Sequence, residues 1–262
     1  MSELPFVMAR YGRGGSFAAA PAAGATSSGA SFENTKSVQF DGVDEEVSCG
    51  DMAALTAHDE ITVSLWFYMT AAGDIAFGSG DNAGSGIFVQ QAGTKMYFGV
   101  GGAYLTTGSG TRPSEDAWHH FCGVFDPSIG GQRGVVYIDG AAVAKTGTMP
   151  TASGAKAGEN IYIGAYAIGT SHFWAGKLDE VAIWDSALSA AQVTNIYKGE
   201  ENGGSGGTNG TTGDLASFSP LGWWRMGDGD TFATLTNHGS TGATNNGTMV
   251  NMESGDIVED VP

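Results

Sequence analysis

The 262-residue sequence has few basic side chains: 11 lysines and arginines stand against 28 aspartates and glutamates, which gives a formal net charge of −17 at pH 7. Nucleic-acid binding needs a basic surface that neutralises phosphates, so we do not expect it here. The same charge disfavours anionic membrane surfaces. An excess of carboxylates is, in contrast, compatible with binding of divalent cations.

Cysteines and long apolar runs are also scarce. The two cysteines, Cys49 and Cys122, each lie inside a predicted strand, and we expect two buried thiols rather than a disulfide. No apolar run reaches the ~20 residues of a membrane-spanning helix. The N-terminus lacks the basic and apolar regions of a secretory signal peptide. We therefore expect a chain made in a cytoplasm and not inserted into a membrane.

Common catalytic signatures are missing as well. The sequence has no G-x-x-x-x-G-K-[ST] phosphate loop. His119 and His120 are adjacent, and neighbouring side chains of a strand point to opposite faces, so this pair is not expected to chelate one metal ion. We expect the protein not to be an enzyme.

Glycine is abundant, with 43 residues, which indicates many tight turns. Short runs of strand character lie between them. The longest is I-T-V-S-L-W-F-Y-M at 61–69, in which the odd-numbered residues share one apolar face. Further strands are expected near 37–40, 75–77, 87–90, 96–100, 118–125, 135–138, 141–145 and 160–164. Many short strands with frequent turns are typical of an all-β sandwich.

The stretch from Phe173 to Tyr197 combines a strand with a helix. An apolar-rich run ends in Trp184 and reads as a buried strand. Ser189 and Gln192 then have the spacing of a capping box, which predicts the start of one short α-helix.

Two segments are of low complexity. Residues 1–35, rich in glycine, alanine and serine, predict a flexible N-terminal arm. This arm is either a disordered leader or an anchor that orders against a neighbouring subunit. Residues 199–213 read as a Gly/Ser-rich linker, and a tryptophan-containing segment, 214–262, follows it.

Three pieces of the chain resemble one family. They are S-V-Q-F-D-G-V-D-E-E-V-S at 37–48, W-H-H-F-C-G-V-F-D at 118–126 followed by V-V-Y-I-D-G at 135–140, and G-K-L-D-E-V-A-I-W at 176–184. Their order and spacing resemble the LamG-like, concanavalin A-like lectin/glucanase domains. The resemblance implies an all-β fold, a two-sheet antiparallel jelly-roll sandwich with one short α-helix, over residues 36–198.

The C-terminal segment resembles the opening of such a domain. L-G-W-W-R-M-G-D-G-D-T, beginning at Leu221, is similar to the part that normally precedes the first of the three pieces. Either the order is permuted, so that residues 214–262 complete the jelly roll in cis or in trans, or the segment is a truncated second repeat. A piece of this size is too small to form a sandwich of its own.

The resemblance also suggests a calcium site, and no other cofactor is expected. The suggested ligands are Asp44, Asp179, Asn237, Asn245 and Asn246. The alternative makes Asp44 a turn residue and Asp179 a hydrogen-bonded strand carboxylate. Glucanases of this superfamily carry an E-x-D-x-x-E run on one strand, and this chain has none.

Aromatic residues in or beside predicted loops form a candidate sugar platform, because aromatic faces stack on sugar rings. They are Tyr104, Tyr166, His172, Phe173 and Trp174. The alternative is that these side chains pack at the rim of the sandwich.

The C-terminal sequence is similar to LamG-like virion proteins of marine tailed phages. This implies a non-enzymatic capsid decoration protein or tail-associated adhesin, made in the host cytoplasm and located in the virion. Its partners would be itself or other virion proteins, through residues 1–35 and the C-terminal strand, and a cell-surface glycan. The alternative is an extracellular carbohydrate-binding module of a secreted bacterial protein.

Overall fold

A computed structural model describes residues 32–57, 60–70, 74–80, 86–152, 160–166 and 172–262. The predicted N-terminal arm therefore lies outside the described residues except for its last four positions. No helix in the described part of the chain is long and apolar enough to cross a membrane.

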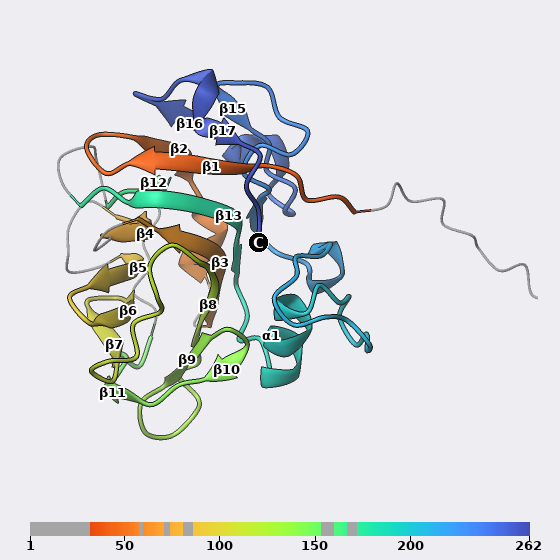
Figure 1. Cartoon of the computed structure of the whole chain (residues 1–262). Helices are drawn as coiled ribbons and strands as arrows, with labels where there is room; N and C mark the ends of the chain where they lie inside the picture. The colour runs from red at the N-terminus through yellow and green to blue at the C-terminus, as the bar shows by residue number, and fades with distance from the viewer. Residues whose placement is uncertain (1–31, 58–59, 71–73, 81–85, 153–159, 167–171) are drawn as a thin grey trace, which may run out of the picture. The chain divides into compact units, whose positions relative to one another are not determined.

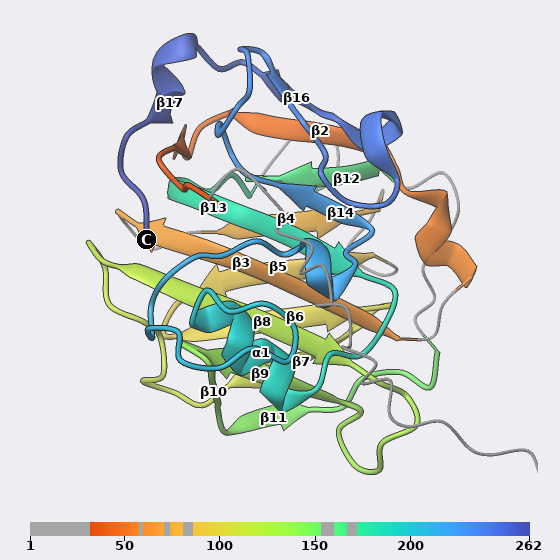
Figure 2. The same ribbon diagram turned by 90° about the vertical axis from the view of Figure 1, so that its right-hand side faces the viewer.

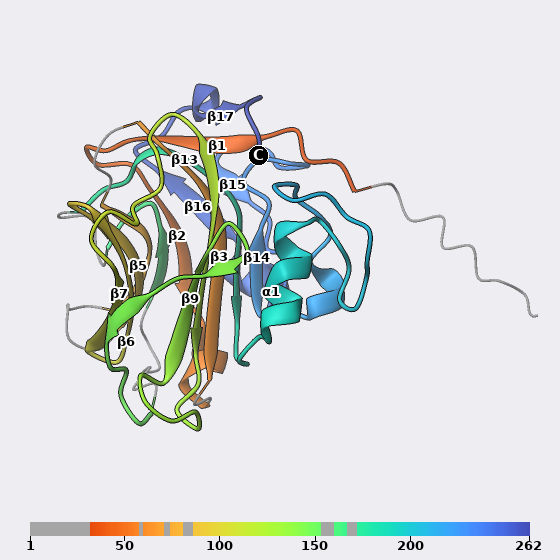
Figure 3. The same cartoon turned by 60° about the horizontal axis from the view of Figure 1, so that its bottom comes forward.

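The described strands form two antiparallel sheets that face each other (Figures 1 and 3), as the sequence predicts. The eight-stranded sheet runs in the order β10 (Ala141–Ala142), β9 (Gly134–Ile138), β8 (Trp118–Phe125), β3 (Ile61–Met69), β13 (Ala175–Trp184), β1 (Ser37–Asp41), β17 (Ile257–Val258), with β14 (Gly222–Trp224) also on β13. The nine-stranded sheet runs β11 (Lys145–Gly147), β7 (Ala103–Thr107), β6 (Lys95–Val100), β5 (Ile87–Ala92), β4 (Ile75–Ser79), β12 (Asn160–Ile163), β2 (Glu46–Asp51), β16 (Gly247–Val250), β15 (Thr234–Leu235).

The described helical elements are short. The single α-helix among them is α1 (Ala190–Tyr197). Turns of 3-10 helix are η1 (Ala53–Ala57), η2 (Ala216–Phe218), η3 (Gly242–Asn245) and η4 (Ser254–Asp256).

The main hydrophobic core fills the space between the sheets. The odd-numbered residues of β3 enter it, as their alternation predicts, and so do Leu178, Val181 and Ile183 of β13. Burial of each such aliphatic side chain contributes roughly 1.5–3 kcal/mol, so this core is the main source of stability. Cys49 and Cys122 are both buried and free, which confirms the prediction of two thiols.

A second apolar cluster covers the other face of the eight-stranded sheet (Figure 2). Trp184 of β13 packs there with Val193 and Ile196 of α1 and with Phe218 and Trp223 from the segment that follows. The eight-stranded sheet is therefore buried on both faces where α1 lies.

The predicted capping box begins α1. Ser189 Oγ accepts a hydrogen bond from Gln192 N at 3.3 Å, and Gln192 Oε1 accepts one from Ser189 N at 2.9 Å. Residues 199–213, which the composition predicts to be a linker, fold back on the end of this helix. Gly210 N donates to Tyr197 O at 3.0 Å, and the side chain of Thr211 donates to the Lys198 carbonyl at 2.9 Å. Backbone hydrogen bonds thus hold this glycine-rich segment against α1.

The C-terminal segment supplies strands to both sheets. One edge of β13 pairs with β3, and the opposite edge is shared: β1 pairs with Ala175–Leu178 and β14 with Val181–Ile183. Trp224 enters the main core and Trp223 the second cluster, because they point to opposite faces of β14. We propose that residues 214–262 complete this domain in cis rather than forming a separate one.

This arrangement predicts a large effect of Trp224→Ala. The Trp224 side chain is fully buried, and its Nε1 donates to Asn245 O at 2.9 Å. Its removal leaves a cavity and an unpaired carbonyl, so the free energy of unfolding should fall by about 3–5 kcal/mol in urea denaturation. Thr248→Ala, at an exposed position of β16, is the matched control and should change it by less than about 0.5 kcal/mol. Equal effects of the two substitutions would show that the C-terminal segment is an appendage.

Candidate functional site

The outer face of the nine-stranded sheet carries a row of aromatic and glycine residues. Directly opposite one another on successive strands lie Gly78 of β4, Phe88 of β5, Gly99 of β6 and Tyr104 of β7. Residues in such register share one face of the sheet. The row therefore places two aromatic rings on this face, with a residue lacking a side chain beside each.

The two glycines make room for the rings. A Cβ atom at Gly99 would lie 1.9 Å from Cε1 of Phe88, so the Phe88 ring lies directly above the backbone of the neighbouring strand. A Cβ atom at Gly78 would lie 3.3 Å from Cδ2 of Tyr166 and 2.8 Å from the Ala165 carbonyl oxygen. Glycine at these positions allows Phe88 and Tyr166 to lie against the sheet.

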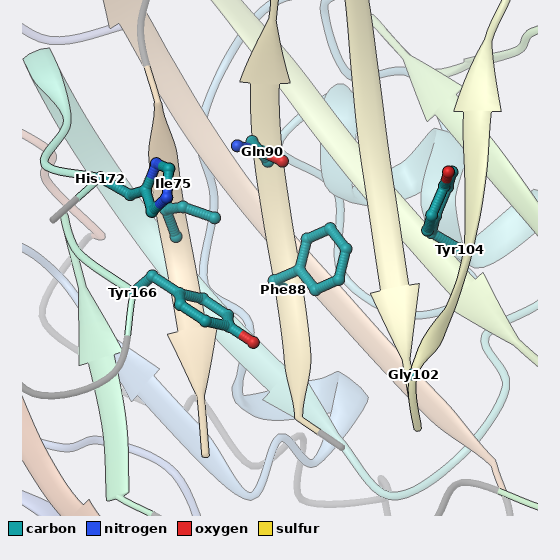
Figure 4. Close-up of a pocket in the computed structure, with 7 residues that line it drawn as sticks. All are labelled: Ile75, Phe88, Gln90, Gly102, Tyr104, Tyr166 and His172. Carbon is teal, nitrogen blue, oxygen red and sulfur yellow. The ribbon is translucent and has the colours of Figure 1, made fainter. Parts of the chain in front are cut away.

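These rings border a pocket of about 180 Å³. Figure 4 shows the Phe88 ring between Tyr166 and Tyr104. The Phe88 and Tyr166 rings meet edge-on, with centroids 6.2 Å apart. The lining residues are Ile75, Phe88, Gln90, Gly102, Tyr104, Tyr166 and His172. The volume is below the ~300–1,000 Å³ of pockets that enclose drug-sized ligands, so a ligand here would be held against one face and stay partly in solvent.

A carboxylate fixes the polar groups of the pocket. Asp74 Oδ1 accepts a hydrogen bond from Gln90 Nε2 at 2.8 Å, and Asp74 Oδ2 accepts one from His172 Nδ1 at 2.7 Å. Because the amide nitrogen of Gln90 is held on the His172 side, its oxygen lies on the side of Phe88 and Tyr104 (Figure 4). The pocket thus offers an oriented acceptor beside aromatic surfaces.

The structure brings together three of the aromatic residues predicted from sequence. Tyr104, Tyr166 and His172 all line the pocket. Trp174 does not join them, because its side chain is fully buried in the main core, edge-on to Phe67. The position of Trp174 beside a predicted loop did not indicate that its side chain is buried. Trp174 lies one residue before β13, and apolar side chains of β13 face the core.

Phe88 and Gln90 line the pocket but were not predicted as site residues. The signal was present in I-F-V-Q-Q-A at 87–92, where burial alternates residue by residue along β5. Alternation exposes every second side chain of a strand to one face, so an aromatic and an amide two residues apart share that face. What the sequence does not show is which strands lie beside them.

The residues that the resemblance suggests for calcium lie in different settings. Asn246 Oδ1 accepts from Asn237 N at 2.9 Å, and Asn245 Nδ2 donates to two carbonyls near the end of β2. Asp44 is exposed in the β1–β2 turn, and Asp179 is buried on β13. Among the described residues no group of three or more histidine, cysteine, aspartate and glutamate side chains is placed to hold a metal ion. Calcium binding stays a prediction.

Asp179 and its neighbour Glu180 lie at a β-bulge. The pairing of β13 with β3 shifts register after Asp179, and Glu180 adopts a φ of 45°. Regular alternation predicts that the two carboxylates point to opposite faces, but a bulge re-aims side chains locally, and both are buried. Glu180 accepts a hydrogen bond from Trp223 Nε1 and lies 3.4 Å from Arg225 Nε.

This cluster holds the segment that precedes β1. Asp179 Oδ2 accepts from Asn34 Nδ2 at 2.7 Å. Asp228, whose Oδ2 lies 3.6 Å from an Arg225 nitrogen, accepts hydrogen bonds from the backbone and hydroxyl of Thr35 and from the backbone of Lys36. These buried carboxylates therefore act as acceptors for the chain's own N–H and O–H groups.

Burial raises the pKa of the adjacent carboxyl groups. Loss of hydration raises the pKa of Asp179 well above its usual range, and the charge of Glu180 adds to this. Loss of hydration also raises the pKa of Glu180 to about 7, although the hydrogen bond from Trp223 and the charge of Arg225 oppose the shift.

Two histidines of β8 lie beside serines. His120 Nε2 is 2.8 Å from Ser64 Oγ, and both side chains are buried; loss of hydration lowers the pKa of His120 to about 4, so it is neutral at pH 7. His119 Nε2 is 3.0 Å from Ser114 Oγ, and its Nδ1 is 2.8 Å from Asp139 Oδ2. Asp139 Oδ1 also accepts from the backbone of His120, so this chain of contacts joins the turn after β9 to β8.

The fold and the pocket define a jelly-roll β-sandwich with an aromatic pocket on the outer face of one sheet. The sequence profile of the concanavalin A-like lectin/glucanase superfamily, a laminin G type, matches residues 41–194. The chain belongs to this family, as the resemblance of its motifs implies. A search of curated protein sequences finds no match.

Three solved structures are similar to this chain. A candidate carbohydrate-binding protein from Bacteroides ovatus has a TM-score of 0.58 at 15% identity; the match covers 83% of this chain and 58% of the other, so the chain spans little more than half of that protein. Domain 4 of an extracellular arabinanase from Geobacillus stearothermophilus, solved with arabinotriose, has a TM-score of 0.48 at 18% identity, covering 63% and 78%. A pentraxin from Limulus polyphemus has a TM-score of 0.47 at 16% identity, covering 62% and 82%.

The raised pKa of Glu180 predicts a pH-dependent stability. An unfolded glutamate ionises near its ordinary pKa of 4.5. Between that pH and about 7 the folded protein keeps a proton that the unfolded chain has released, so the free energy of unfolding falls as pH rises. Glu180→Gln keeps an acceptor for Trp223 without the charge and should remove roughly 1–3 kcal/mol of this fall.

The measurement is urea denaturation of both proteins at pH 5 and pH 7.5. His120 and groups distant from position 180 are common to both proteins and cancel in the comparison. Asp179 does not cancel: without the Glu180 charge its pKa is raised less, which reduces the fall in the same direction. The control is Glu201→Gln, at an exposed position, which should leave the pH dependence unchanged. An identical fall in wild type and Glu180→Gln would refute a protonated Glu180 in the folded state.

Proposed function

We propose that this protein is a non-enzymatic carbohydrate-binding protein and that the pocket around Phe88 is its binding site. The observation that carries the proposal is the combination of partly exposed aromatic rings with one oriented amide on the outer face of the nine-stranded sheet. Apolar faces of sugar rings stack on aromatic side chains, while hydroxyl groups need a few fixed polar partners.

The residues divide these tasks between them. Phe88 and Tyr166 offer apolar surface, and Tyr104, 49% exposed, extends it towards solvent. Gln90 presents an acceptor for a sugar hydroxyl, and Asp74 holds both Gln90 and His172 in place. A site fixed in this way loses little side-chain entropy when a ligand binds.

The family and one neighbour support the proposal. The superfamily includes lectins by its description, and the Bacteroides ovatus protein is named for carbohydrate binding. Because one fold serves many functions, this support is secondary to the geometry of the pocket.

We further propose a virus particle, of the tailed-phage kind, as the setting in which the protein acts. The support is the similarity of the C-terminal sequence to phage LamG-like virion proteins. A carbohydrate-binding module of a secreted bacterial protein would use the same pocket. Mass spectrometry of purified virions distinguishes the two settings: peptides of this chain should be present in the particles, and their absence would favour the secreted module.

Loss of glycan binding in Phe88→Ala is the direct test. The full chain is screened on a glycan array, and the dissociation constant of a bound glycan is then measured by calorimetry. Removal of the stacking ring should weaken binding by about tenfold or more. Phe232→Ala removes an aromatic side chain that is 41% exposed on another loop and should bind like wild type. Unchanged binding in Phe88→Ala, or loss in both variants, would contradict the assigned site.

The contacts of Ser114, His119 and Asp139 have the composition of a hydrolase triad, and we predict that they are structural. Both oxygens of Asp139 are engaged by β8, and the His119 ring contacts Phe67 of the core at 5.9 Å between centroids. The described pocket belongs to the opposite sheet. A hydrolase also needs oxyanion donors and a substrate cleft next to the nucleophile.

A fluorophosphonate probe should therefore not label the protein, and β-glucans should not be hydrolysed. Labelling that is present in wild type and lost in Ser114→Ala, with an unchanged melting temperature, would show that the protein is an enzyme.

A further inference from the structure

We propose that the pocket is part of an extended site that runs across strands β4 to β7, and that its ligand is a neutral oligosaccharide. This inference rests on the proposed carbohydrate binding and adds the size and charge of the ligand. It depends on three features: the length of the aromatic row, the polar row that runs beside it, and the distribution of charge.

The aromatic row is longer than one sugar ring. Tyr166 lies over Gly78 on β4, Phe88 is on β5 with its ring over Gly99 on β6, and Tyr104 is on β7. Three strand spacings of ~4.8 Å separate the first position from the last, about 14 Å in all. A six-membered ring of ~1.5 Å bonds spans only ~3 Å. The row therefore offers stacking surface to more than one sugar residue.

A second row on the same face can take part in hydrogen bonding. Gln90, Tyr97 and Thr106 lie opposite one another on β5, β6 and β7. Each lies two residues along its strand from a member of the aromatic row, which is ~6.6 Å away. The rows also touch, because the Tyr97 and Tyr104 rings meet with centroids 5.6 Å apart. An oligosaccharide on the aromatic row would thus have the amide of Gln90 and the hydroxyl group of Tyr97 along one side, whereas Thr106 is buried and its hydroxyl donates to the Thr107 carbonyl.

The charge around the pocket favours a neutral ligand. Among the described residues that line the pocket there is no lysine, arginine, aspartate or glutamate. The Asp74 carboxylate contacts two of the lining side chains, Gln90 and His172. An acidic sugar would meet this carboxylate and a chain of net charge −17 without an arginine or lysine partner in the pocket.

Calorimetry on the full chain tests both parts of the inference. The probes are neutral gluco-, xylo-, manno- and arabino-oligosaccharides of one to six residues, with oligogalacturonides of equal length as the acidic set. For the neutral series that binds, affinity should rise about tenfold or more from one residue to three and then level off. The acidic set should bind at least about tenfold more weakly.

Three variants test the aromatic row. Tyr104→Ala, at a half-exposed position that should not affect folding, should remove most of the gain with length and so weaken binding of an oligosaccharide more than binding of a monosaccharide. Tyr104→Phe keeps the ring and should retain the gain. Phe88→Ala should weaken binding of every length.

The outcomes separate this inference from the function on which it rests. Equal affinity for one and for several residues, with loss in Phe88→Ala, would overturn the extended site and leave carbohydrate binding standing. Tighter binding of the acidic set would overturn the neutral ligand. If no neutral or acidic series binds, both the inference and the proposed function fail.

Discussion

The structure depends on the burial of β13, of which only Ala175 and Lys177 are partly exposed. Its backbone groups pair with β3 on one edge and with β1 and β14 on the other, and its side chains enter the main core on one face and the cluster under α1 on the other. An unpaired buried strand edge would cost the hydrogen bonds of its N–H and C=O groups. The C-terminal strand β14 therefore belongs to the fold as much as β1 does, although some 180 residues of sequence separate them.

Strand β13 also carries two buried carboxyl groups among its apolar side chains. The bulge at Asp179 and Glu180 places two carboxyl groups where hydration is lost, which disfavours their ionised forms. Hydrogen bonds from Asn34 and Trp223 and the charge of Arg225 offset part of that cost. The cluster also holds the segment before β1 through hydrogen bonds from Asn34 to Asp179 and from Thr35 and Lys36 to Asp228. These bonds fix the position at which the chain enters the sandwich.

The two sheets differ in what lies on their outer faces. Because α1 and the segment after it pack on the eight-stranded sheet, the aromatic row stands on the outer face of the nine-stranded sheet. Small residues at 78 and 99 let rings lie against that face, and one carboxylate orients the polar groups.

The sequence alone determined the elements and the fold class. Alternation at 61–69 gave the correct inward face of β3, the Ser189–Gln192 spacing gave the start of α1, and the ordered motifs gave the jelly roll. These features depend on local periodicity and on residue spacing, which a sequence displays directly. Tyr104, Tyr166 and His172 were named as candidates because they are aromatic residues in or beside predicted loops, and all three line the pocket; their role in glycan binding stays a prediction.

Only the tertiary structure decided which of those aromatics share a site. Trp174 is next to His172 in the neighbourhood of one loop, yet one lies in the core and the other at the pocket. Phe88 and Gln90 line the pocket because β4, β5, β6 and β7 pair side by side. This pairing is set by hydrogen bonds between strands, which the local sequence does not display. The bulge at Glu180 likewise interrupts the alternation expected for Asp179 and Glu180, since register shifts arise from pairing with β3 and leave no local signal in the sequence.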